Sequence, residues 1–462
     1  MNIVLFNKDL RISDHQPLAE ATASGEVLPL YVFEPSQWNE KPLSARHLQF
    51  VVESLEELSN EIKEKGGKLF TAINEVEIVL EGLLESYHSI NIFAHNDGWF
   101  IDKVKKWADQ NQQSLFCYGP ELVNVHGKRF YERFVSYLKE PQTEVPAHID
   151  VPSRLPGFLL TDLKKLQTFK IKGEKIRFGQ QGGEWKAIET LDSFLEDRFA
   201  KYIENYTKPL PSSLSSSRLS AYITWGNISI RTIFQRTEEK LQTCKVEEEK
   251  TQYEEFLSKL ISRVKICSME SPEQELHAIS EIKRDWNEEW FQRWLQGRTG
   301  IPIIDAAMRS LTKTGWMNFS LRALVTSFIT NTLLLDVKNP SHALAGLFLD
   351  YEPAVHDFYI QQHAEMKGKM KIIDPVKVGK ELDPDGVFIR RYIPELSRLP
   401  EEYIHEPWLY PAFYRLGYEA PMVDVKKKCK QARLQYQSIK SKGKPGRKKG
   451  EGGETEQLSF DF

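Results

Sequence analysis

The stretch "WLQGRTGIPIIDAAMRSLTKTGWMNFSLRA", residues 294–323, decides the fold of this chain. Its Gly-rich entry leads into "TGWMNFSLRA", residues 314–323, which has the pattern of the start of an amphipathic helix. An acidic, His-bearing segment, "LDYEPAVHDFYIQQH" at 349–363, follows further on. The Trp, Phe and Leu residues here fit either plain core or the wall of a chemical site, and the rest of the chain has to distinguish the two.

Helical patterns surround this stretch. From "GGEWKAIETLDSFLEDRFAKYI" at 182–203 to about residue 435, apolar residues recur at helical spacing and strand alternation nearly vanishes. The first 120 residues instead alternate short apolar runs, such as "IVLF" and "VLPLYVF", with helical segments, which is the pattern of a doubly wound parallel sheet. We therefore predict an α/β plus all-α architecture: a Rossmann-like domain over 1–120, a Pro- and Gly-rich linker over 121–180, an all-helical domain over 181–435, and a basic disordered tail over 436–462.

Composition limits the classes of function. The 462 residues are 40% apolar and 27% charged, as in ordinary globular proteins of two or three domains. No apolar run reaches 18 residues and no leader pattern opens the chain, so we predict a cytoplasmic protein without a membrane span. The four cysteines are far apart, which favours neither a disulfide framework nor a metal site. Net charge is −3, but residues 426–450 hold eleven Lys or Arg and no acidic residue.

Several motifs together resemble the photolyase and cryptochrome family of flavoproteins. They occur in the family's order over roughly residues 1–435 and read "NIVLFNKDLRISDHQPLAEA" (2–21), "SSRLSAYITWGNIS" (216–229), "GRTGIPIIDAAMR" (297–309) and "FIRRYIPEL" (388–396). The resemblance implies FAD held in the helical domain. It also implies a light-driven reaction, either repair of pyrimidine dimers by a DNA photolyase or, alternatively, blue-light signalling without repair. A second, antenna chromophore is left open, because its usual ligands cannot be identified.

Candidate FAD ligands follow position by position. Ser216, Ser217 and Ser220 stand where a helix should begin, and Arg263 would supply the cation that a diphosphate needs; a Ser-rich linker with an ordinary cap is the alternative. The cofactor-binding set implied by the resemblance is Tyr202, Ser216, Ser217, Leu219, Ser220, Arg263, Arg322, Asp350, Glu352 and His356. The set predicted to act in the chemistry is Phe319, Arg322, Asp350 and His356, with Arg322 and Asp350 forming an ion pair that tunes the reduced flavin.

The residues that would recognise a dimer depart from the family's pattern. Lys259 and Ser262 stand where dimer-repairing members have a Glu that bonds the flipped-out dimer and a Trp that stacks on it. Phe319 and Ala323 stand where Asn and Met are expected. The cofactor half of the site is therefore predicted to be intact and the substrate half rewritten, which favours the signalling alternative.

Two further departures concern protons and electrons. His356 aligns with the Asn that faces the flavin N5, so it either holds a proton near neutral pH or is bonded to Asp357 or Glu352 on a solvated turn. Two positions of the family's tryptophan relay are Val337 and Ile360, and Trp286 is the candidate for the third. The other aromatic residues that could form another route, or simply be core, are Trp290, Trp294, Trp316, Tyr351, Tyr359 and Tyr392.

The end of the chain, "QLSFDF" at 457–462, resembles the short bacterial motif that docks on the DNA sliding clamp, although it also fits an arbitrary polar tail. The basic run before it would add salt-dependent attraction to phosphates. With the family resemblance, this favours repair. We therefore predict UV-damaged DNA as the partner, with the sliding clamp as a second one, and a monomeric protein.

Overall fold

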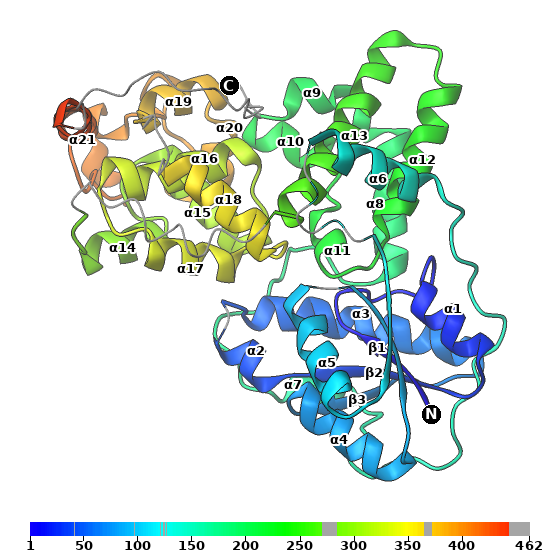
Figure 1. The fold of residues 1–462 in the computed structure, drawn as a ribbon. Helices are drawn as coiled ribbons and strands as arrows, with labels where there is room; N and C mark the ends of the chain where they lie inside the picture. Colours follow the sequence, from blue (N-terminus) through cyan, green and yellow to red (C-terminus); the bar gives the residue numbers. More distant parts are fainter. Residues whose placement is uncertain are drawn as a thin grey trace.

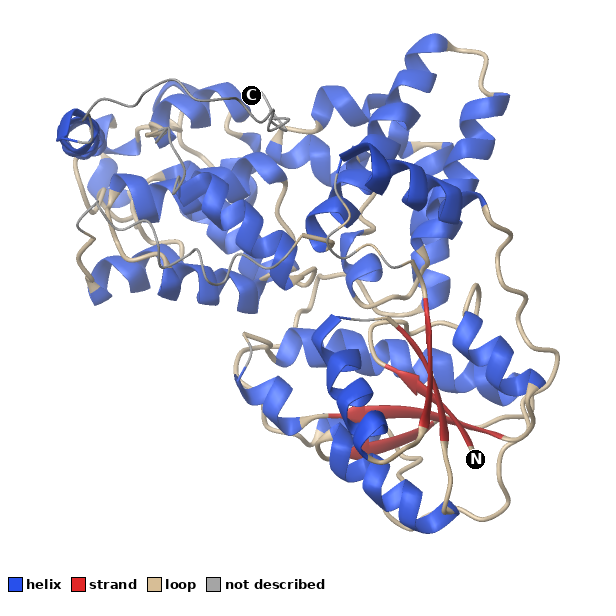
Figure 2. Cartoon of the chain, in the orientation of Figure 1, coloured by secondary structure: helices blue, strands red, loops and turns tan. Residues whose placement is uncertain are grey.

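The computed structural model describes residues 1–462 apart from 41, 97, 121, 123, 124, 126, 270–283, 365–371 and 443–462. Within the described residues an N-terminal α/β domain is followed by two groups of helices, so the predicted fold class is confirmed (Figures 1 and 2). The clamp-like end at 457–462 lies outside the described residues.

A five-stranded parallel sheet of order β3-β2-β1-β4-β5 forms the N-terminal domain. β1 and β2 are buried along their whole length, as central parallel strands are, whereas the edge strand β5 is largely exposed. Pro29 lies opposite Val4 on β1 but precedes Leu30, where pairing with β3 begins, so no bond to β3 is lost. The strands are β1 (Asn2–Phe6), β2 (Val27–Phe33), β3 (Phe70–Ile73), β4 (Asn91–His95) and β5 (Ser114–Tyr118).

Helices cover both faces of this sheet. α4 and α5 bury one face in a core of their own, while α1 and α3 cover the other face in a core that continues into the first helical group. The helical domain is therefore attached to the sheet by a shared hydrophobic core. The helices are α1 (Gln16–Ala23), α2 (Pro35–Glu40), α3 (Ala45–Glu64), α4 (Val76–Tyr87) and α5 (Gly98–Gln110).

The connector after the sheet is less irregular than its Pro and Gly content indicated. It contains the short helix α7 (Lys164–Gln167) and the 13-residue helix α6 (Gly127–Lys139), whose Phe130 and Phe134 are buried and which packs on α12. Apolar residues four apart on α6 outweigh the surrounding turn signals. Leu160 of the same connector makes an antiparallel bridge with Thr71 at the sheet edge.

The helical part consists of two groups, and the second group has a separate core. α21 continues to Lys442, past residue 436, where a disordered tail was predicted to begin. The first group comprises α8 (Glu184–Glu196), η1 (Arg198–Lys201), α9 (Tyr202–Asn205), α10 (Pro209–Ser215), α11 (Ser220–Thr224), α12 (Ile230–Thr243) and α13 (Glu247–Cys267). The second comprises α14 (Glu288–Leu295), α15 (Pro302–Thr314), α16 (Phe319–Ser327), the π-helix η3 (Phe328–Thr332), α17 (Lys338–Leu347), α18 (Pro353–Ala364), α19 (Pro375–Leu382), α20 (Val387–Tyr392), η4 (Pro394–Leu396), η5 (Glu401–Tyr403), η6 (Pro407–Leu409), η7 (Phe413–Arg415) and α21 (Val425–Lys442).

The loop after β1 fixes the sheet to the first helical group. Arg11 donates to the carbonyl oxygen of Gly226 at 3.0 Å, and the Ile12 amide donates to the Glu184 carboxylate at 2.7 Å. Gly226 has φ +68°, and a Cβ there would lie 2.0 Å from the carbonyl oxygen of Lys8. Only glycine fits at this position, which explains the "WGN" sequence and fixes the segment just after the Ser-rich stretch.

The stretch from residue 297 folds onto the start of α15. The buried Asp305 carboxylate accepts hydrogen bonds from the Thr299 amide at 2.7 Å, the Thr299 hydroxyl at 2.6 Å, the Gly300 amide at 2.9 Å and the Tyr418 hydroxyl at 2.5 Å. Gly300 has φ +77°, and a Cβ there would meet the Ala420 backbone at 2.4 Å. This loop therefore orients α15, and through it the start of α16, where the candidate site lies.

Candidate functional site

A buried ion pair lies at the centre of the predicted site. Nη2 of Arg322, on α16, contacts both carboxylate oxygens of Asp350, at 2.9 and 2.8 Å. Burial alone would raise the pKa of Asp350, but the charges of Arg322 and Arg263, with hydrogen bonds from Arg322 and Ser220, hold that pKa below its usual value. The structure thus brings together four of the residues that the sequence singled out, around one fixed negative charge.

Arg263 and the Ser-rich loop supply donors next to this ion pair. Arg263 Nη2 donates to the Thr224 hydroxyl at 2.8 Å, and this hydroxyl lies 3.3 Å from the Asp350 carbonyl oxygen. The Ser216 hydroxyl is buried without a hydrogen-bond partner among the described residues. An unpaired buried hydroxyl fits a phosphate-bearing cofactor. The helix expected at these serines is α11, which starts at Ser220 and has Leu219, not a serine, as its N-cap.

The loop from 216 to 220 is held in an unusual backbone conformation. Arg218 has φ +60°, in the left-handed region that side-chain-bearing residues rarely adopt. Arg198 fixes the loop, because its guanidinium donates to the carbonyl oxygens of Ser216, Ser217 and Thr190. No sequence motif singles out Arg198, since most of its partners are main-chain oxygens.

His356 is buried on α18 rather than placed on a solvated turn. Its Nε2 lies 3.1 Å from the hydroxyl and the carbonyl oxygen of Ser341, and burial lowers its pKa to about 4. The ring is therefore neutral at pH 7 and does not titrate there. Glu352, predicted to bind the cofactor, forms an ion pair with Lys8 of the α/β domain at 2.8 Å.

Phe319 belongs to an aromatic cluster that the sequence did not indicate. Its ring meets Tyr359 and His363 edge-on, with centroids 5.0 Å away in each case, and the Tyr359 and His363 rings are parallel at 6.1 Å. Nε2 of His363 is buried and has no hydrogen-bond partner among the described residues. The sequence spacing could have indicated part of this cluster, because Tyr359 and His363 are four residues apart on α18 and therefore share one face of the helix. We call Phe319, Tyr359 and His363 the aromatic cluster.

The other predicted positions also make contacts within the protein. The Lys259 ammonium lies 3.1 Å from a Glu255 carboxylate oxygen and 5.3 Å from the Tyr206 ring centroid. Tyr202 is buried and meets Tyr206 edge-on, and Leu219 is part of the core shared with the sheet. Lys259, where the resemblance implies an acid, is therefore an ammonium paired with a carboxylate.

The positions of the missing tryptophan relay are filled by core residues. Val337 and Ile360 are both buried in the core of the second helical group. A different series of rings starts at Trp286, which is 40% exposed, and continues through Phe291 at 4.9 Å to the buried Trp294 at 6.1 Å between centroids. Whether these rings carry electrons stays a prediction.

A histidine pair lies at the carboxyl ends of the parallel neighbours β1 and β4. After these two strands the chain continues to strands on opposite sides, β2 and β5. Asp9 Oδ2 lies 3.0 Å from Nε2 of His15 and 2.7 Å from Nδ1 of His95. Nδ1 of His15 accepts the Leu18 amide hydrogen at 3.1 Å, so the ring proton sits on Nε2 and is donated to Asp9. If a metal were bound at Nε2 of His15, the ring proton would have to move to Nδ1, where it would face the Leu18 N–H. The observed tautomer therefore favours a hydrogen-bond network over a metal site.

Buried neutral histidines predict the pH dependence of stability. Burial lowers the pKa of His47, His95, His356 and His363 to about 4 from 6.5. Between these values the unfolded chain binds protons that the folded protein does not, so the free energy of unfolding is expected to fall as pH decreases from 6.5 to 4. Urea unfolding at pH 7, 6 and 5 measures this. A free energy that is constant over this range would contradict the expected burial of the neutral rings.

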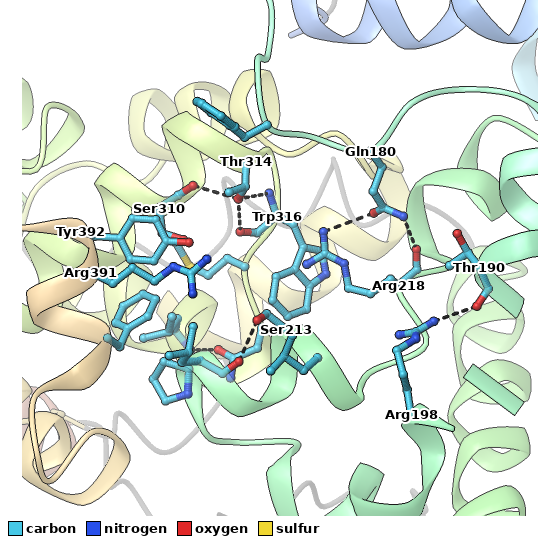
Figure 3. A pocket seen from close by; sticks show the side chains of 18 of the residues that line it. Gln180, Thr190, Arg198, Ser213, Arg218, Ser310, Thr314, Trp316, Arg391 and Tyr392 are labelled. Atoms are coloured by element: carbon cyan, nitrogen blue, oxygen red, sulfur yellow. Dashed lines mark hydrogen bonds between the residues drawn. The ribbon is translucent and has the colours of Figure 1, made fainter. Parts of the chain in front are cut away.

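A cavity of about 520 Å³ lies between the two helical groups, and Figure 3 shows its lining from close by. Arg218, Met317, Asn318 and Leu321 line it, and each lies within two positions in sequence of a residue predicted to bind the cofactor or to act in the chemistry. None of the residues predicted to bind FAD lines this cavity itself. Residues from the segments 216–220 and 316–322 therefore contribute both to the ion-pair site and to this separate cavity.

Comparison with known proteins identifies these features as those of a family. A model described as DNA photolyase matches residues 2–133, and one described as the FAD binding domain of DNA photolyase matches residues 249–438. The chain belongs to the photolyase and cryptochrome family. A deoxyribodipyrimidine photo-lyase of Alkalihalophilus pseudofirmus is 27% identical, covering 94% of this chain and 97% of the relative. Cryptochrome-2 of Arabidopsis thaliana is 26% identical, covering 92% of this chain and 76% of the relative.

The fold of this family member is also found in solved structures. A bacterial class III photolyase from Agrobacterium tumefaciens superimposes with a TM-score of 0.80 at 24% identity, covering 95% of this chain and 98% of that one. The matched FAD-binding domain makes FAD the cofactor of this chain, and the buried Ser216 hydroxyl, unpaired among the described residues, fits a phosphate-bearing group. None of the described helices is both long and apolar enough to cross a membrane.

Proposed function

We propose that this protein is a light-dependent DNA photolyase that binds UV-damaged DNA and splits pyrimidine dimers. FAD, when bound, reduced and excited by light, would supply the electron that opens the dimer and take the electron back afterwards. The observation that carries the proposal is the buried Arg322–Asp350 pair with Arg263 beside it. Two guanidinium groups against one carboxylate leave a net positive charge, which would stabilise an anionic reduced cofactor without reorganising, because it is fixed in place before light arrives.

The substrate side of the proposal rests on the aromatic cluster. A flipped-out base is held by stacking and by hydrogen bonds to its edges. The rings of Phe319 and Tyr359 offer stacking surface in place of the Trp that Ser262 replaces. The unpaired Nε2 of His363, neutral at pH 7, offers one hydrogen bond to a carbonyl or imino group of the lesion. These residues would position the dimer, and Lys259 would lie nearby as a cation attractive to DNA phosphate.

Replacing Phe319 by alanine is expected to weaken binding of a dimer-containing oligonucleotide by about tenfold, because one base–aromatic stacking contact contributes about 1–3 kcal/mol. FAD content, read from the flavin absorption band, is expected to stay unchanged. Phe116→Ala is a matched control, since Phe116 is a half-exposed phenylalanine on β5 of the other domain. Equal affinities of the two variants would exclude the aromatic cluster as the lesion contact.

The direct test of repair is a comparison of light and dark. The purified, FAD-loaded protein is incubated with oligonucleotides carrying a cyclobutane dimer or a (6-4) product, each single-stranded and double-stranded. Loss of lesions under blue light and not in the dark is expected for at least one substrate. If no substrate loses its lesion in the light, the protein is not a photolyase.

A blue-light receptor of the cryptochrome type is the second candidate. It is favoured by Lys259 and Ser262, which remove the acid and the stacking ring that the resemblance associates with dimer repair. A receptor would change its surface on illumination. Light-dependent changes in protease sensitivity, without loss of lesions in the repair assay, would favour this candidate over the enzyme.

A further inference from the structure

The cavity of about 520 Å³ has a lining suited to a charged ligand. It is bounded by α8, α10, the segment 178–180, the end of α15, the start of α16 and α20 (Figure 3). Its volume lies within the range of small-molecule sites. Arg198, Arg218 and Arg391 line it, and the lining carboxylate Glu189 is already paired with Lys186 at 2.8 Å. The lining therefore has an excess of positive charge.

Arg218 is the clearest sign that an anion belongs there. Burial lowers the pKa of its guanidinium to about 10, and within the described part of the chain it forms no ion pair with a carboxylate. Its side-chain hydrogen bond goes to the amide oxygen of Gln180 at 3.4 Å, and the carboxylate that influences it most, Asp350, is committed to Arg322. A buried charge without a counter-charge is costly, and an anionic ligand would remove that cost.

Arg198 adds a second guanidinium without a counter-charge in the same cavity. Its hydrogen bonds go to carbonyl oxygens and to the Ser193 hydroxyl, which accept hydrogen bonds but carry no net charge. Burial lowers the pKa of Arg198 as well. Two partly buried guanidinium groups that line one space are an arrangement that binds phosphate in proteins.

Aromatic and amide groups in the same lining fit a planar ring. Trp316 carries the Arg218 guanidinium 4.0 Å above its ring centroid, and Tyr392 and Phe178 line other parts of the space. Gln180 and Asn318 bring amide groups to it. We propose that the cavity is a second ligand site, distinct from the residues that hold FAD, and that it binds a nucleoside phosphate with its phosphate on Arg198 and Arg218. This site does not depend on the repair activity proposed above.

The test uses the FAD-loaded protein and AMP as the probe, with adenosine and inorganic phosphate as separate arms in calorimetric titrations. Saturable binding of AMP, with adenosine and phosphate each at least about tenfold weaker, is the expected result. Phosphate that binds as tightly as AMP would leave the ring without a role and overturn the proposal. Binding of AMP only to FAD-free protein would assign the cavity to FAD itself and would equally overturn it.

Two variants locate the binding. Arg218→Gln is expected to weaken AMP binding by about tenfold, and Arg391→Gln, at the exposed edge, by a few fold with its fold intact. Arg415→Gln is the control, because Arg415 is an exposed arginine stacked over an aromatic ring, 5.5 Å from the Tyr414 centroid, outside the cavity. Undiminished AMP binding by the folded Arg391→Gln and Arg218→Gln proteins would place the ligand elsewhere. Repair of lesions and AMP binding are measured separately, so failure of one leaves the other testable.

Discussion

Replacing Arg322 by alanine is expected to reduce the free energy of unfolding by about 3–5 kcal/mol, because removing one partner of a buried ion pair leaves the other charge uncompensated. Asp350 is only 7% exposed and would keep Arg263 as its remaining neighbouring cation. The substitution also removes the donor to the Met317 carbonyl oxygen at 2.9 Å, at the start of α16. FAD retention is expected to be lost as well, since the variant changes the charge that the cofactor would meet.

A matched control separates the buried charge from arginine removal in general. Arg309 contacts both oxygens of Glu395 at 2.9 Å, with the same chemistry, but both side chains are about one-quarter exposed. Arg309→Ala should cost about 1 kcal/mol, because water can solvate the carboxylate left behind. The measurements are urea unfolding and the ratio of flavin to protein absorbance. If the two variants lost equal stability and both retained FAD, the Arg322–Asp350 pair would have no special role.

The fold could be predicted because its signals are local and periodic. β1 and β2 are short, wholly buried apolar runs, and α3 follows a helical pattern that ends at a glycine-containing turn. The spacing of apolar residues along the chain was therefore enough to predict these elements. α6 was missed because its three buried positions stand among Pro- and Gly-rich flanks. The helical groups were predicted as one domain, whereas two separate cores meet at the site, and sequence periodicity does not report which helices share a core.

The candidate site could be predicted only where an alignment fixed the partners. Arg322 and Asp350, 28 residues apart, lie where the family resemblance placed them. The contact of the His356 ring with Ser341 depends on how α17 and α18 pack, and no local pattern encodes that packing. Arg198 was invisible because it recognises main-chain oxygens, which every residue carries.

Asp305→Ala is expected to have the largest effect on stability outside the cofactor site, about 4 kcal/mol or more. The residue is fully buried, and its carboxylate accepts four hydrogen bonds, from two amides and two hydroxyls around Thr299, Gly300 and Tyr418. Alanine would leave these donors buried without acceptors, and each such donor costs about 1–3 kcal/mol unless it relaxes toward water. The Gly-rich loop at 297–300 would then lose its attachment to α15, and α16 its orientation.

Two milder variants and a pH series test this account. Tyr418→Phe removes a single donor and should cost about 1 kcal/mol, while Asp305→Asn keeps one acceptor oxygen and should fall between the two. Burial raises the pKa of Asp305 to about 6 from 3.8, so the folded protein holds a proton that the unfolded chain has released. Its contribution to stability is therefore present below pH 3.8 and lost as pH rises through 6, opposite in sign to the buried histidines. Asp305→Asn should steepen the net rise of stability between pH 4 and 6, because only the histidine contribution remains; an unchanged slope would show that Asp305 is ionised throughout.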